Sequence, residues 1–515
     1  MFYKPQKGHF KDDTVVFHNG HYYMFSMYSK NESETRKDEE YCNVWLAVSD
    51  DGVHWKDYGI VISAPFRVYA MAIYKAGDVF YLNHGSYSDN GCQNVLRFWK
   101  SENLLDWEYL GDKYDLRPDT RYYDENSRLD CMDVVVQEAD GKTVYYGYAT
   151  GPGGWLVSLD GINWEGKKPP IIEWGEISPP PIPEEEGIFE IGGCQKIGEK
   201  YYLIGGWFNY MGYSGYGVYT LIGDSPNGPF KPDITAYRLN GNSKRWVNMW
   251  ARFCRADKEL LISSYLYDGY TYEKGSTYLP PLKKAVVDVY GHLRMRYWCG
   301  NEAVKGRKLP FDCNNNSIIF NDALLTDPQK RFKIINDKTF ELSTCEEIPS
   351  YEQGDYVPTA IVQNEFLFDF YKGVILEGKI KITSEAARCV AGSIGFYLAE
   401  NSESGTYILF DSYGITRIGH LTVKNNHLNF VAEDETRMGF CAAIAGITPQ
   451  EYHTFRIFAR KNMFETYIDD CYIQTFNTTH FINTIGVTPK KIGFIIQNGI
   501  GIFEDICVYE MNFED

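Results

Sequence analysis

The sequence lacks several features that mark common classes of protein. Helical periodicity is almost absent from its 515 residues. No run of about eighteen apolar residues occurs, so no segment is predicted to span a membrane as a helix. The start of the chain, MFYKPQKGHF, contains no basic segment followed by an apolar one, and no signal peptide is recognised. We therefore expect a cytoplasmic protein, although a secreted protein whose leader has been removed would start in the same way.

Positive charge is also scarce. The chain has 51 Lys and Arg residues against 69 Asp and Glu residues, which gives a formal net charge of −18 at pH 7. A field of this sign repels phosphate backbones and anionic membrane surfaces. We expect neither nucleic acid nor a membrane as a partner, and the sequence gives no indication of the oligomeric state.

Spacings typical of metal sites are missing too. The twelve Cys residues are scattered and none forms a CxxC pair, so the sequence does not support a zinc site. His9, His18, His21 and His84 show no ligand spacing. Reduced, buried thiols are expected, because cysteines scattered through a long chain do not resemble a disulfide scaffold. We expect no metal and no cofactor.

What the sequence does contain is the pattern of an all-β protein. Strands of about five to eight residues recur between Gly, Asn-Gly and Asp-Gly turns. Aromatic residues make up 16 % of the chain; they are typical of sheets, and flat rings also suit stacking on sugars. A chain of this length exceeds one ordinary core, so two domains are expected.

The first domain carries an internal repeat. The phrases VWLAVSDDGVHW, VLRFWKSENLLDW, WLVSLDGINW and VYTLIGDSPNGPF end at Trp55, Trp107, Trp164 and Phe230. Each follows a hairpin rich in aromatic residues, and a hairpin plus such a phrase makes about four strands, the size of one propeller blade. A fifth unit runs from about Trp246 onwards. The sequence therefore predicts a five-bladed β-propeller over residues 1–308.

The pattern changes after the propeller. Residues 309–356 contain Asn-rich and Pro-containing turns and are interpreted as a linker that holds a possible first sandwich strand. From residue 357 to residue 515, short alternating or apolar runs return without the period of the first domain. Spacing of this kind predicts a C-terminal β-sandwich of two sheets.

Three hairpins of the first domain carry acidic residues where the first strand begins. These acids are Asp12 and Asp13, Asp130 and Asp133, and Glu190. A propeller directs its innermost strands to a central channel, so residues at these strand starts share one cavity. Cleavage of a glycosidic bond needs one carboxyl group to protonate the leaving oxygen and another to attack or stabilise the cationic centre. Neighbouring acids also push their pKa values apart, which leaves one ionised and one protonated.

These motifs resemble the five-bladed glycosidases of glycoside hydrolase families 32, 43 and 68. Lys11–Phe25 is similar to the first-blade motif, in which an Asp precedes an apolar strand, a Gly turn and an aromatic pair. Arg128–Asp130 resembles the Arg-Asp-Pro motif of the third blade, and Phe189–Gly193 resembles the fourth-blade motif that begins with the acid/base Glu. Phe455–Tyr472 resembles a segment of the C-terminal sandwich of family 32, which favours fructosidases over arabinan- or xylan-cleaving relatives.

The sequence departs from the family pattern at three places. Asp13 stands where the family has Pro, Leu129 separates Arg128 from Asp130, and the Cys-Pro that follows the acid/base Glu is absent. In the first blade two acids therefore compete for one role. Neighbours on a strand point to opposite faces, so only one of them faces the channel. The spacing to the aromatic pair matches the family for Asp12, which we favour.

Rival acids exist at the other two positions as well. Asp133 is the alternative to Asp130, three residues further on and so on the other face. Glu184–Glu186 are rivals of Glu190, but they follow a Pro-rich turn that is typical of a solvated loop. We favour Asp130 and Glu190, the latter because of its spacing.

The resemblance implies a role for each of the favoured acids. Asp12 would be the nucleophile that forms a covalent glycosyl intermediate. Glu190 would protonate the leaving oxygen and later activate water, and Asp130 would hold sugar hydroxyls and stabilise the developing positive charge. The candidates for substrate binding are Arg128, Trp155 and Trp207. The alternative roles are a surface salt bridge for the arginine and core packing for the tryptophans.

The sequence therefore predicts a retaining glycoside hydrolase of family 32 type that cleaves β-fructofuranosyl linkages in sucrose, fructan or fructo-oligosaccharides. A fructosyltransferase would use the same three acids with a sugar as acceptor. An arabinofuranosidase or xylosidase of family 43 type is the next hypothesis. A carbohydrate-binding propeller without activity is the hypothesis from a different class.

Overall fold

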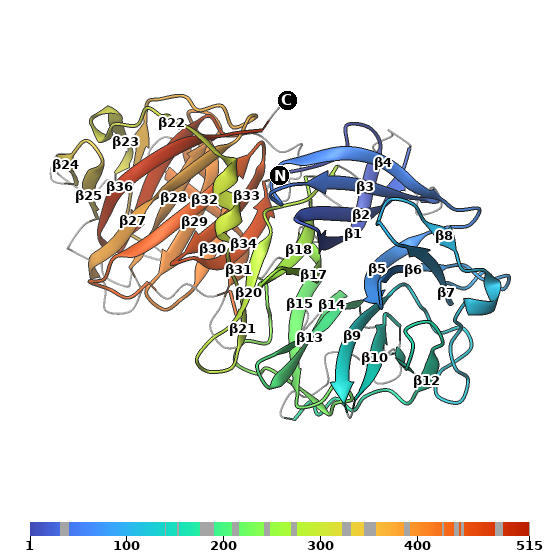
Figure 1. Ribbon diagram of the computed structural model, residues 1–515. Helices are drawn as coiled ribbons and strands as arrows, with labels where there is room; N and C mark the ends of the chain where they lie inside the picture. The colour runs from blue at the N-terminus through green and yellow to red at the C-terminus, as the bar shows by residue number, and fades with distance from the viewer. Residues whose placement is uncertain are drawn as a thin grey trace.

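The computed structural model is built almost entirely of β-strands, which form two parts (Figure 1). The first part, blue to green, is a ring of small sheets, and the second, mostly orange to red, is a pair of larger sheets. None of the helices in the described residues is long and apolar enough to cross a bilayer. The described residues are 1–30, 41–139, 141–151, 154–175, 190–208, 216–240, 248–268, 276–321, 331–344, 357–385, 392–424, 427–436, 442–443, 447–478 and 488–513.

Four antiparallel sheets of four strands follow one another along the chain, and in each the strands pair in sequence order. The first contains β1 (His9–His18), β2 (His21–Ser29), β3 (Asn43–Ser49) and β4 (Trp55–Ser63). The second contains β5 (Tyr69–Ala76), β6 (Val79–Ser86), β7 (Val95–Ser101) and β8 (Glu108–Tyr109). The third contains β9 (Met132–Ala139), β10 (Lys142–Ala149), β11 (Gly154–Ser158) and β12 (Glu165–Lys167). The fourth contains β13 (Glu190–Ile197), β14 (Lys200–Phe208), β15 (Tyr216–Gly223) and β16 (Phe230–Pro232).

The hairpin of β1 and β2 shows how local sequence determines these sheets. Asn19 and Gly20 have φ values of 49° and 82°, the left-handed backbone that a two-residue hairpin turn requires. His18 pairs with His21 across the turn. Alternation along the strands then buries the paired side chains of Val15 and Met24. The predicted hairpin is confirmed.

The strands predicted to form a fifth blade do not make a separate sheet. They are β17 (Asn248–Ala256), β18 (Glu259–Tyr267), β20 (Lys283–Val287) and β21 (Leu293–Tyr297), with the short β19 (Thr277–Tyr278) paired to β18. They pair in order, but β21 also pairs with a strand of the second part, at Arg296 and Cys471. They therefore belong to a sheet of thirteen strands. In the first part, four units form separate sheets instead of the predicted five. The fifth unit is not separate because a strand of the second part, β34, pairs with its outer strand β21.

The first strands of the five units are packed in a ring. β1 contacts β5, β5 contacts β9, β9 contacts β13, β13 contacts β17, and β17 contacts β1. The start of each of these strands consequently lies near one common centre. This arrangement decides which residues far apart in the sequence meet.

The second part consists of two sheets packed face to face. The rest of the thirteen-stranded sheet contains β22 (Lys305–Leu309), β24 (Phe332–Asn336), β25 (Thr339–Ser343), β27 (Val374–Glu385), β32 (His453–Arg460), β33 (Met463–Ile468), β34 (Cys471–Asn477) and β36 (Gly499–Met511). The seven-stranded sheet contains β23 (Asn316–Asn321), β26 (Thr359–Asn364), β28 (Ser393–Ala399), β29 (Ser404–Asp411), β30 (Thr416–Lys424), β31 (His427–Thr436) and β35 (Lys491–Gln497). Phe494 of one sheet lies 4.9 Å from Phe503 of the other, measured between ring centroids.

The region interpreted as a linker contributes more strands than the one expected. β22, β23, β24 and β25 all lie in or at the edge of residues 309–356, and each pairs within the two large sheets. In the sequence of the β24–β25 hairpin, the alternation typical of a short strand is visible only over Thr339–Ser343. The Asn- and Asp-containing turns on either side dominate the sequence pattern of this region, which therefore resembles a linker. Three short 3₁₀ helices complete the described elements: η2 (Asp112–Tyr114), η4 (Cys299–Val304) and η5 (Cys313–Asn315).

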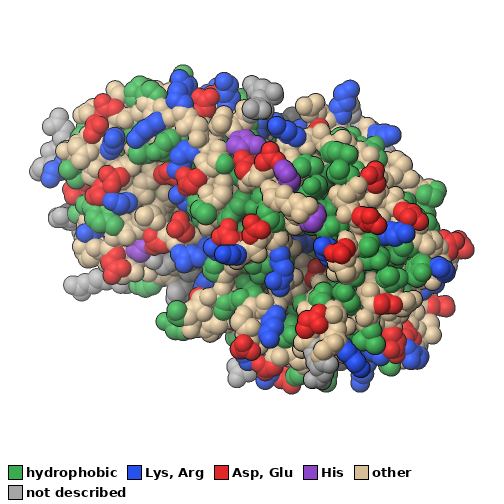
Figure 2. All heavy atoms as spheres, in the orientation of Figure 1, with side chains coloured by type: hydrophobic (Ala, Val, Ile, Leu, Met, Phe, Trp, Pro, Cys, Tyr) green, Lys and Arg blue, Asp and Glu red, His purple; other side chains and the backbone are tan. Residues whose placement is uncertain are grey.

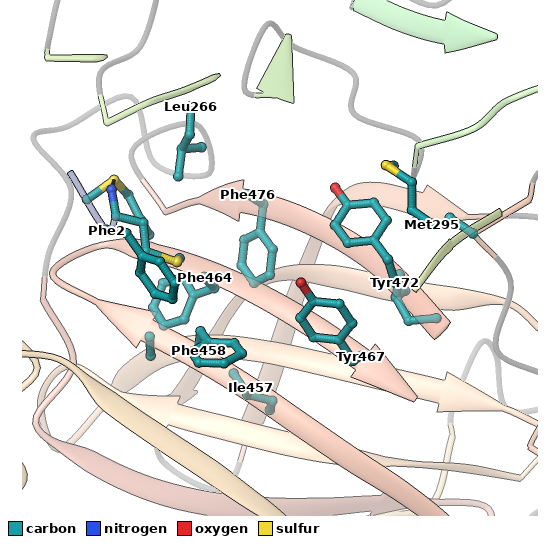
Figure 3. Packing of buried hydrophobic residues seen from close by; sticks show 14 of the residues in the cluster. Phe2, Leu266, Met295, Ile457, Phe458, Phe464, Tyr467, Tyr472 and Phe476 are labelled. Carbon is teal, nitrogen blue, oxygen red and sulfur yellow. Dashed lines mark hydrogen bonds between the residues drawn. The ribbon is translucent and has the colours of Figure 1, made fainter. Parts of the chain in front are cut away.

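The two parts share one continuous hydrophobic core. Figure 3 shows Leu266 and Met295 of the first part facing Phe464, Tyr472 and their neighbours on β32–β34. All of these side chains belong to one cluster of buried residues. On the outside, acidic and basic side chains are interspersed over the face shown in Figure 2, which carries no extended surface of one sign.

A completely buried ion pair crosses the same junction. The Nζ atom of Lys283, on β20, lies 2.7 Å from Oε2 of Glu465, on β33, and neither side chain is exposed. Burial lowers the pKa of Lys283, and the charge of Glu465 opposes that effect. Thr475 and Tyr467 donate hydrogen bonds to the Glu465 carboxylate. The pair is therefore an obligatory part of the junction, because either charge alone would be buried without compensation.

Removal of one partner is expected to destabilise the whole protein. We expect Glu465→Gln to lower the free energy of unfolding by about 3–5 kcal/mol, since the Lys283 ammonium loses its counter-charge. Urea denaturation measures the change. The double variant Lys283→Met/Glu465→Gln should recover a large part of the loss, and a single variant within about 1 kcal/mol of the parent would contradict this account.

Candidate active site

The three favoured acids come together at the centre of the ring. Asp12 lies in β1, Asp130 lies two residues before β9, and Glu190 is the first residue of β13. The charge of Asp12 acts on both Asp130 and Glu190, and that of Asp130 acts on Glu190. The ring of first strands thus unites carboxyl groups that are up to about 180 residues apart in the sequence.

A β-bulge separates Asp12 from its neighbour Asp13. The pairing of β1 with β2 shifts register between Lys11 and Thr14, and Asp12 has a φ of 54°. This left-handed backbone is costly for a residue other than glycine, and bulges of this kind redirect side chains next to active sites. Asp12 is partly exposed, and its Oδ1 accepts a hydrogen bond of 2.8 Å from the Tyr265 hydroxyl.

Asp13 is turned into the core instead. Its side chain is completely buried. Burial raises the pKa of Asp13 to about 7, against the charge of the buried Arg252 guanidinium. Of the two adjacent acids, Asp12 belongs to the acid cluster, and its side chain is the one that solvent can reach.

Asp130 is fixed by two side chains. It is 1 % exposed, the Arg128 guanidinium contacts one carboxylate oxygen, and the Gln93 amide donates to the other. Burial raises the pKa of Asp130 although Arg128 opposes the shift. Because Arg128 and Gln93 each bind one oxygen, the Asp130 carboxylate is held in a fixed orientation, from which it can bind and orient a ligand.

Glu190 is buried beside the other two acids. Its Oε1 lies 3.4 Å from Nη2 of Arg128, and the Tyr216 hydroxyl is its hydrogen-bond partner. Burial raises the pKa of Glu190 to about 7; Arg128 opposes this, and the charges of Asp130 and Asp12 add to it. A carboxyl group with a pKa in this range can both give and take a proton near neutral pH.

Arg128 bridges Asp130 and Glu190 instead of forming a surface salt bridge. Burial works against its charge, but the two carboxylates outweigh burial and raise the pKa of Arg128. The guanidinium therefore remains charged between the third and fourth sheets. Leu129 separates Arg128 from Asp130 in the sequence. Its side chain is buried on the opposite side of this segment, in a hydrophobic cluster that also contains Leu96 and Leu156.

The rival acids lie in other settings. An oxygen of Asp133 accepts the backbone N–H of Cys194 at 2.9 Å, which joins the third sheet to the fourth, and burial raises the pKa of Asp133. Its charge acts on Arg252. Glu184–Glu186 lie outside the described residues.

The two tryptophans predicted to bind substrate are placed differently. The ring of Trp155 stacks on Tyr146 with 6.1 Å between centroids and 6° between planes, within the core between the third and fourth sheets. No described contact joins Trp155 to the three acids. The backbone of Trp207 pairs with Gly217 in the fourth sheet, but its side chain lies outside the described part of the chain.

The sequence did not single out four side chains that surround the acids: Tyr216, Tyr265, Gln93 and Arg252. The two tyrosines are among 41 in the chain, and no local pattern distinguishes them. Arg252 donates to the thiol sulfur of Cys131 at 2.8 Å, and the charges of Asp133 and Asp12 act on its guanidinium. Within the described ranges, no group of three or more His, Cys, Asp or Glu side chains has an arrangement suited to a metal ion.

Comparison with known proteins gives matches in structure only. No protein-family model matches the chain, and no curated protein matches it in sequence. Fructan 1-exohydrolase IIa from Cichorium intybus has a TM-score of 0.65 at 12 % identity, over 100 % of this chain and 97 % of that chain. Sucrose-6-phosphate hydrolase from Lactobacillus gasseri has a TM-score of 0.63 at 13 % identity, over 98 % and 91 %. The family 32 β-fructofuranosidase from Bombyx mori has a TM-score of 0.61 at 11 % identity, over 99 % and 92 %.

Identities in this range establish the fold alone. Since the matches extend over nearly the whole of each chain, they include both the propeller and the two large sheets behind it. The resemblance predicted from the sequence is therefore confirmed as a resemblance of architecture. The chain shares the propeller and β-sandwich fold of these three proteins.

Proposed function

We propose that the protein is a retaining glycoside hydrolase that cleaves β-fructofuranosyl linkages in sucrose, fructan or fructo-oligosaccharides. The observation that carries the proposal is the acid cluster: Asp12 with access to solvent, next to the buried Glu190 with a pKa of about 7. Structural neighbours have been solved with sucrose and with 1-kestose, which supports substrates of this class.

Each acid has a distinct part in the proposed mechanism. Asp12 attacks the anomeric carbon of the fructosyl unit while Glu190 transfers its proton to the leaving oxygen. The Glu190 carboxylate then takes a proton from water, which attacks the same carbon and releases Asp12. Asp130 and Arg128 bind sugar hydroxyls and stabilise the positive charge that develops on the ring. Tyr265 and Tyr216 are positioning residues, because they orient Asp12 and Glu190 through hydrogen bonds.

We also infer that β17, β18, β20 and β21 serve as the fifth blade. The contact of β17 with both β13 and β1 supports this assignment, since it closes the ring. The propeller then extends from β1 to β21, and β22–β36 form the sandwich. Deletion of β22–β36 should yield an insoluble or inactive protein, because β21 and the shared core would lose their cover.

Product analysis tests the proposed reaction. The protein is incubated with sucrose, inulin, levan and an aryl arabinofuranoside, and the products are separated by chromatography. Free fructose supports hydrolysis, and larger fructose-containing products indicate a fructosyltransferase on the same site. Release of arabinose alone, or inversion at the anomeric carbon in early NMR spectra, would reject the proposal in favour of a family 43 type of enzyme. Binding without turnover would leave only a carbohydrate-binding propeller.

The pKa of Glu190 predicts the alkaline limb of the pH profile. The first step needs the protonated form of Glu190, so kcat/KM on sucrose should decrease as the pH rises through about 7. Replacement of Arg128 by Met removes a charge that lowers this pKa, and the limb should move to higher pH. Rates measured between pH 5 and about 9 in one mixed buffer test both statements, and an alkaline limb that does not move in the variant would contradict the role of Arg128.

A further inference from the structure

The register of the fourth sheet places Glu190 and Tyr216 on the same face. Gly206 of β14 pairs with Glu190 of β13 on one side and with Val218 of β15 on the other. Residues that pair directly point to the same face of a sheet, as do residues two apart along one strand. Tyr216 comes two residues before Val218 and therefore shares this face with Glu190. The strand β14 lies between the two side chains.

Gly206 provides the space through which Tyr216 crosses that strand. A Cβ atom added at Gly206 would lie 1.6 Å from the Tyr216 hydroxyl oxygen and 2.1 Å from the Cζ atom of its ring. Real Cβ atoms essentially never come within 3.0 Å of another heavy atom in this way. The backbone of Gly206 is paired on both sides and does not have a left-handed φ. The close approach of the Tyr216 ring, and not the backbone conformation, therefore requires glycine here.

The Tyr216 ring reaches the Glu190 carboxyl group. Its side chain is only 1 % exposed, and its hydroxyl is hydrogen-bonded to Glu190. A hydroxyl that donates to a carboxylate stabilises the ionised form. Burial raises the pKa of Glu190 to about 7, and the hydrogen bond from Tyr216 opposes this effect.

Tyr216 is the partner of Glu190 that depends on residue 206. The three atoms nearest to the Cβ position of Gly206 all belong to Tyr216. A substitution there consequently acts first on this tyrosine. The other charged groups that act on Glu190 or lie on strands beside β13 are Arg128, Asp130, Asp12, Asp133 of β9 and Arg252 of β17.

We propose that Gly206 is a positioning residue of the acid cluster, because its missing side chain allows the Tyr216 hydroxyl to cross β14 and bind the Glu190 carboxylate. A larger residue at this position displaces the ring, since the hydroxyl oxygen and Cζ stand where its Cβ would lie. Glu190 then loses a donor to its ionised form and keeps its proton up to a higher pH. The inference deepens the proposed acid/base role of Glu190 and rests on that role only for the effect on turnover.

Infrared difference spectroscopy of the folded protein, between about pH 5 and about pH 9, measures the titration of Glu190 without any substrate. The carboxyl C=O band of Glu190 is the one that is lost in Glu190→Gln. We expect a midpoint near pH 7 in the parent and a midpoint about one pH unit higher in Gly206→Ala and in Tyr216→Phe. The double variant Gly206→Ala/Tyr216→Phe should titrate no higher than either single variant, because both changes remove the same hydrogen bond.

Gly223→Ala is the matched control for the change at residue 206. Gly223 is the last residue of β15 in the same sheet, and an added Cβ atom would lie 2.9 Å from the ring of Phe230. The neighbour is again an aromatic ring, but Phe230 has no hydroxyl group and packs in a hydrophobic cluster. We expect the Glu190 midpoint of the parent in this variant.

The alkaline limb of kcat/KM on sucrose should move together with the infrared midpoint. The proposal is overturned if Gly206→Ala titrates like the parent, if its shift adds to that of Tyr216→Phe, or if Gly223→Ala shifts the midpoint equally. If Gly206→Ala does not fold by circular dichroism, Gly206→Ala/Tyr216→Leu should fold, because leucine has no atoms at the positions nearest to the added Cβ; failure of that variant as well overturns the proposal. A parent that does not hydrolyse fructosides would reject the proposed function but leave the titration readable, so the two proposals fail separately.

Discussion

Asp12→Asn is expected to lower kcat on sucrose by about 10³-fold or more, with the fold intact. The amide has nearly the shape of the carboxylate and still accepts the hydrogen bond from Tyr265. It cannot form the covalent fructosyl intermediate, so the step that requires a nucleophile is lost. Initial rates at saturating substrate measure the effect, and the urea midpoint reports whether the fold is preserved.

The neighbouring residue provides the matched control. Asp13→Asn makes the same chemical change one residue further along, in a side chain that is completely buried and whose pKa is about 7. Because the protonated acid and the amide are similar in shape and charge, we expect kcat within about tenfold of the parent. Equal losses in the two variants would reject the separation of Asp12 and Asp13 by the bulge, and full activity in Asp12→Asn would remove it from the mechanism.

Glu190→Gln is expected to reduce kcat on sucrose by about 10³-fold or more as well, through the loss of the proton donor. The size of the effect should depend on the leaving group. A fructoside with an acidic phenol as the leaving group needs little protonation, so its first step should proceed at a rate much closer to that of the parent. A burst of phenol followed by slow turnover would therefore identify Glu190 as the acid/base group, because its loss also slows the attack of water.

Asp133→Asn is the control for this substitution. Asp133 is a buried acid of the same neighbourhood, and its role in the structure is to accept the Cys194 N–H, which an amide oxygen also does. Activity near that of the parent is expected on both substrates. If Glu190→Gln lowered the rates on sucrose and on the activated fructoside equally, Glu190 would not be the proton donor.

Local sequence signals predicted much of the fold. The Asn19-Gly20 turn identifies the first hairpin, since its backbone angles are restricted to residues of this kind. The position of acids at strand starts, together with the repeat, led to Asp12, Asp130 and Glu190, which the structure brings together. These features depend on residues that are near one another in the chain.

Features that depend on partners far away in the sequence were not predictable in the same way. The spacing to the aromatic pair favoured Asp12 over Asp13, but the shift in register against β2 is not contained in the sequence of one strand. Tyr265 reaches Asp12 across a separation of 253 residues. The single pair of Arg296 with Cys471 merges the fifth unit with the sandwich, and no repeat or motif marks that contact.

That merged sheet has a consequence for how the chain can change over evolution. The propeller and the sandwich are continuous through β21 and β34, and the buried pair Lys283–Glu465 lies across the same seam. Exchange of the C-terminal half for one from another gene would break the pairing of β21 with β34 and expose the shared hydrophobic core. It would also leave Lys283 buried without its counter-charge. We therefore expect the two halves to be inherited as one unit rather than shuffled as modules.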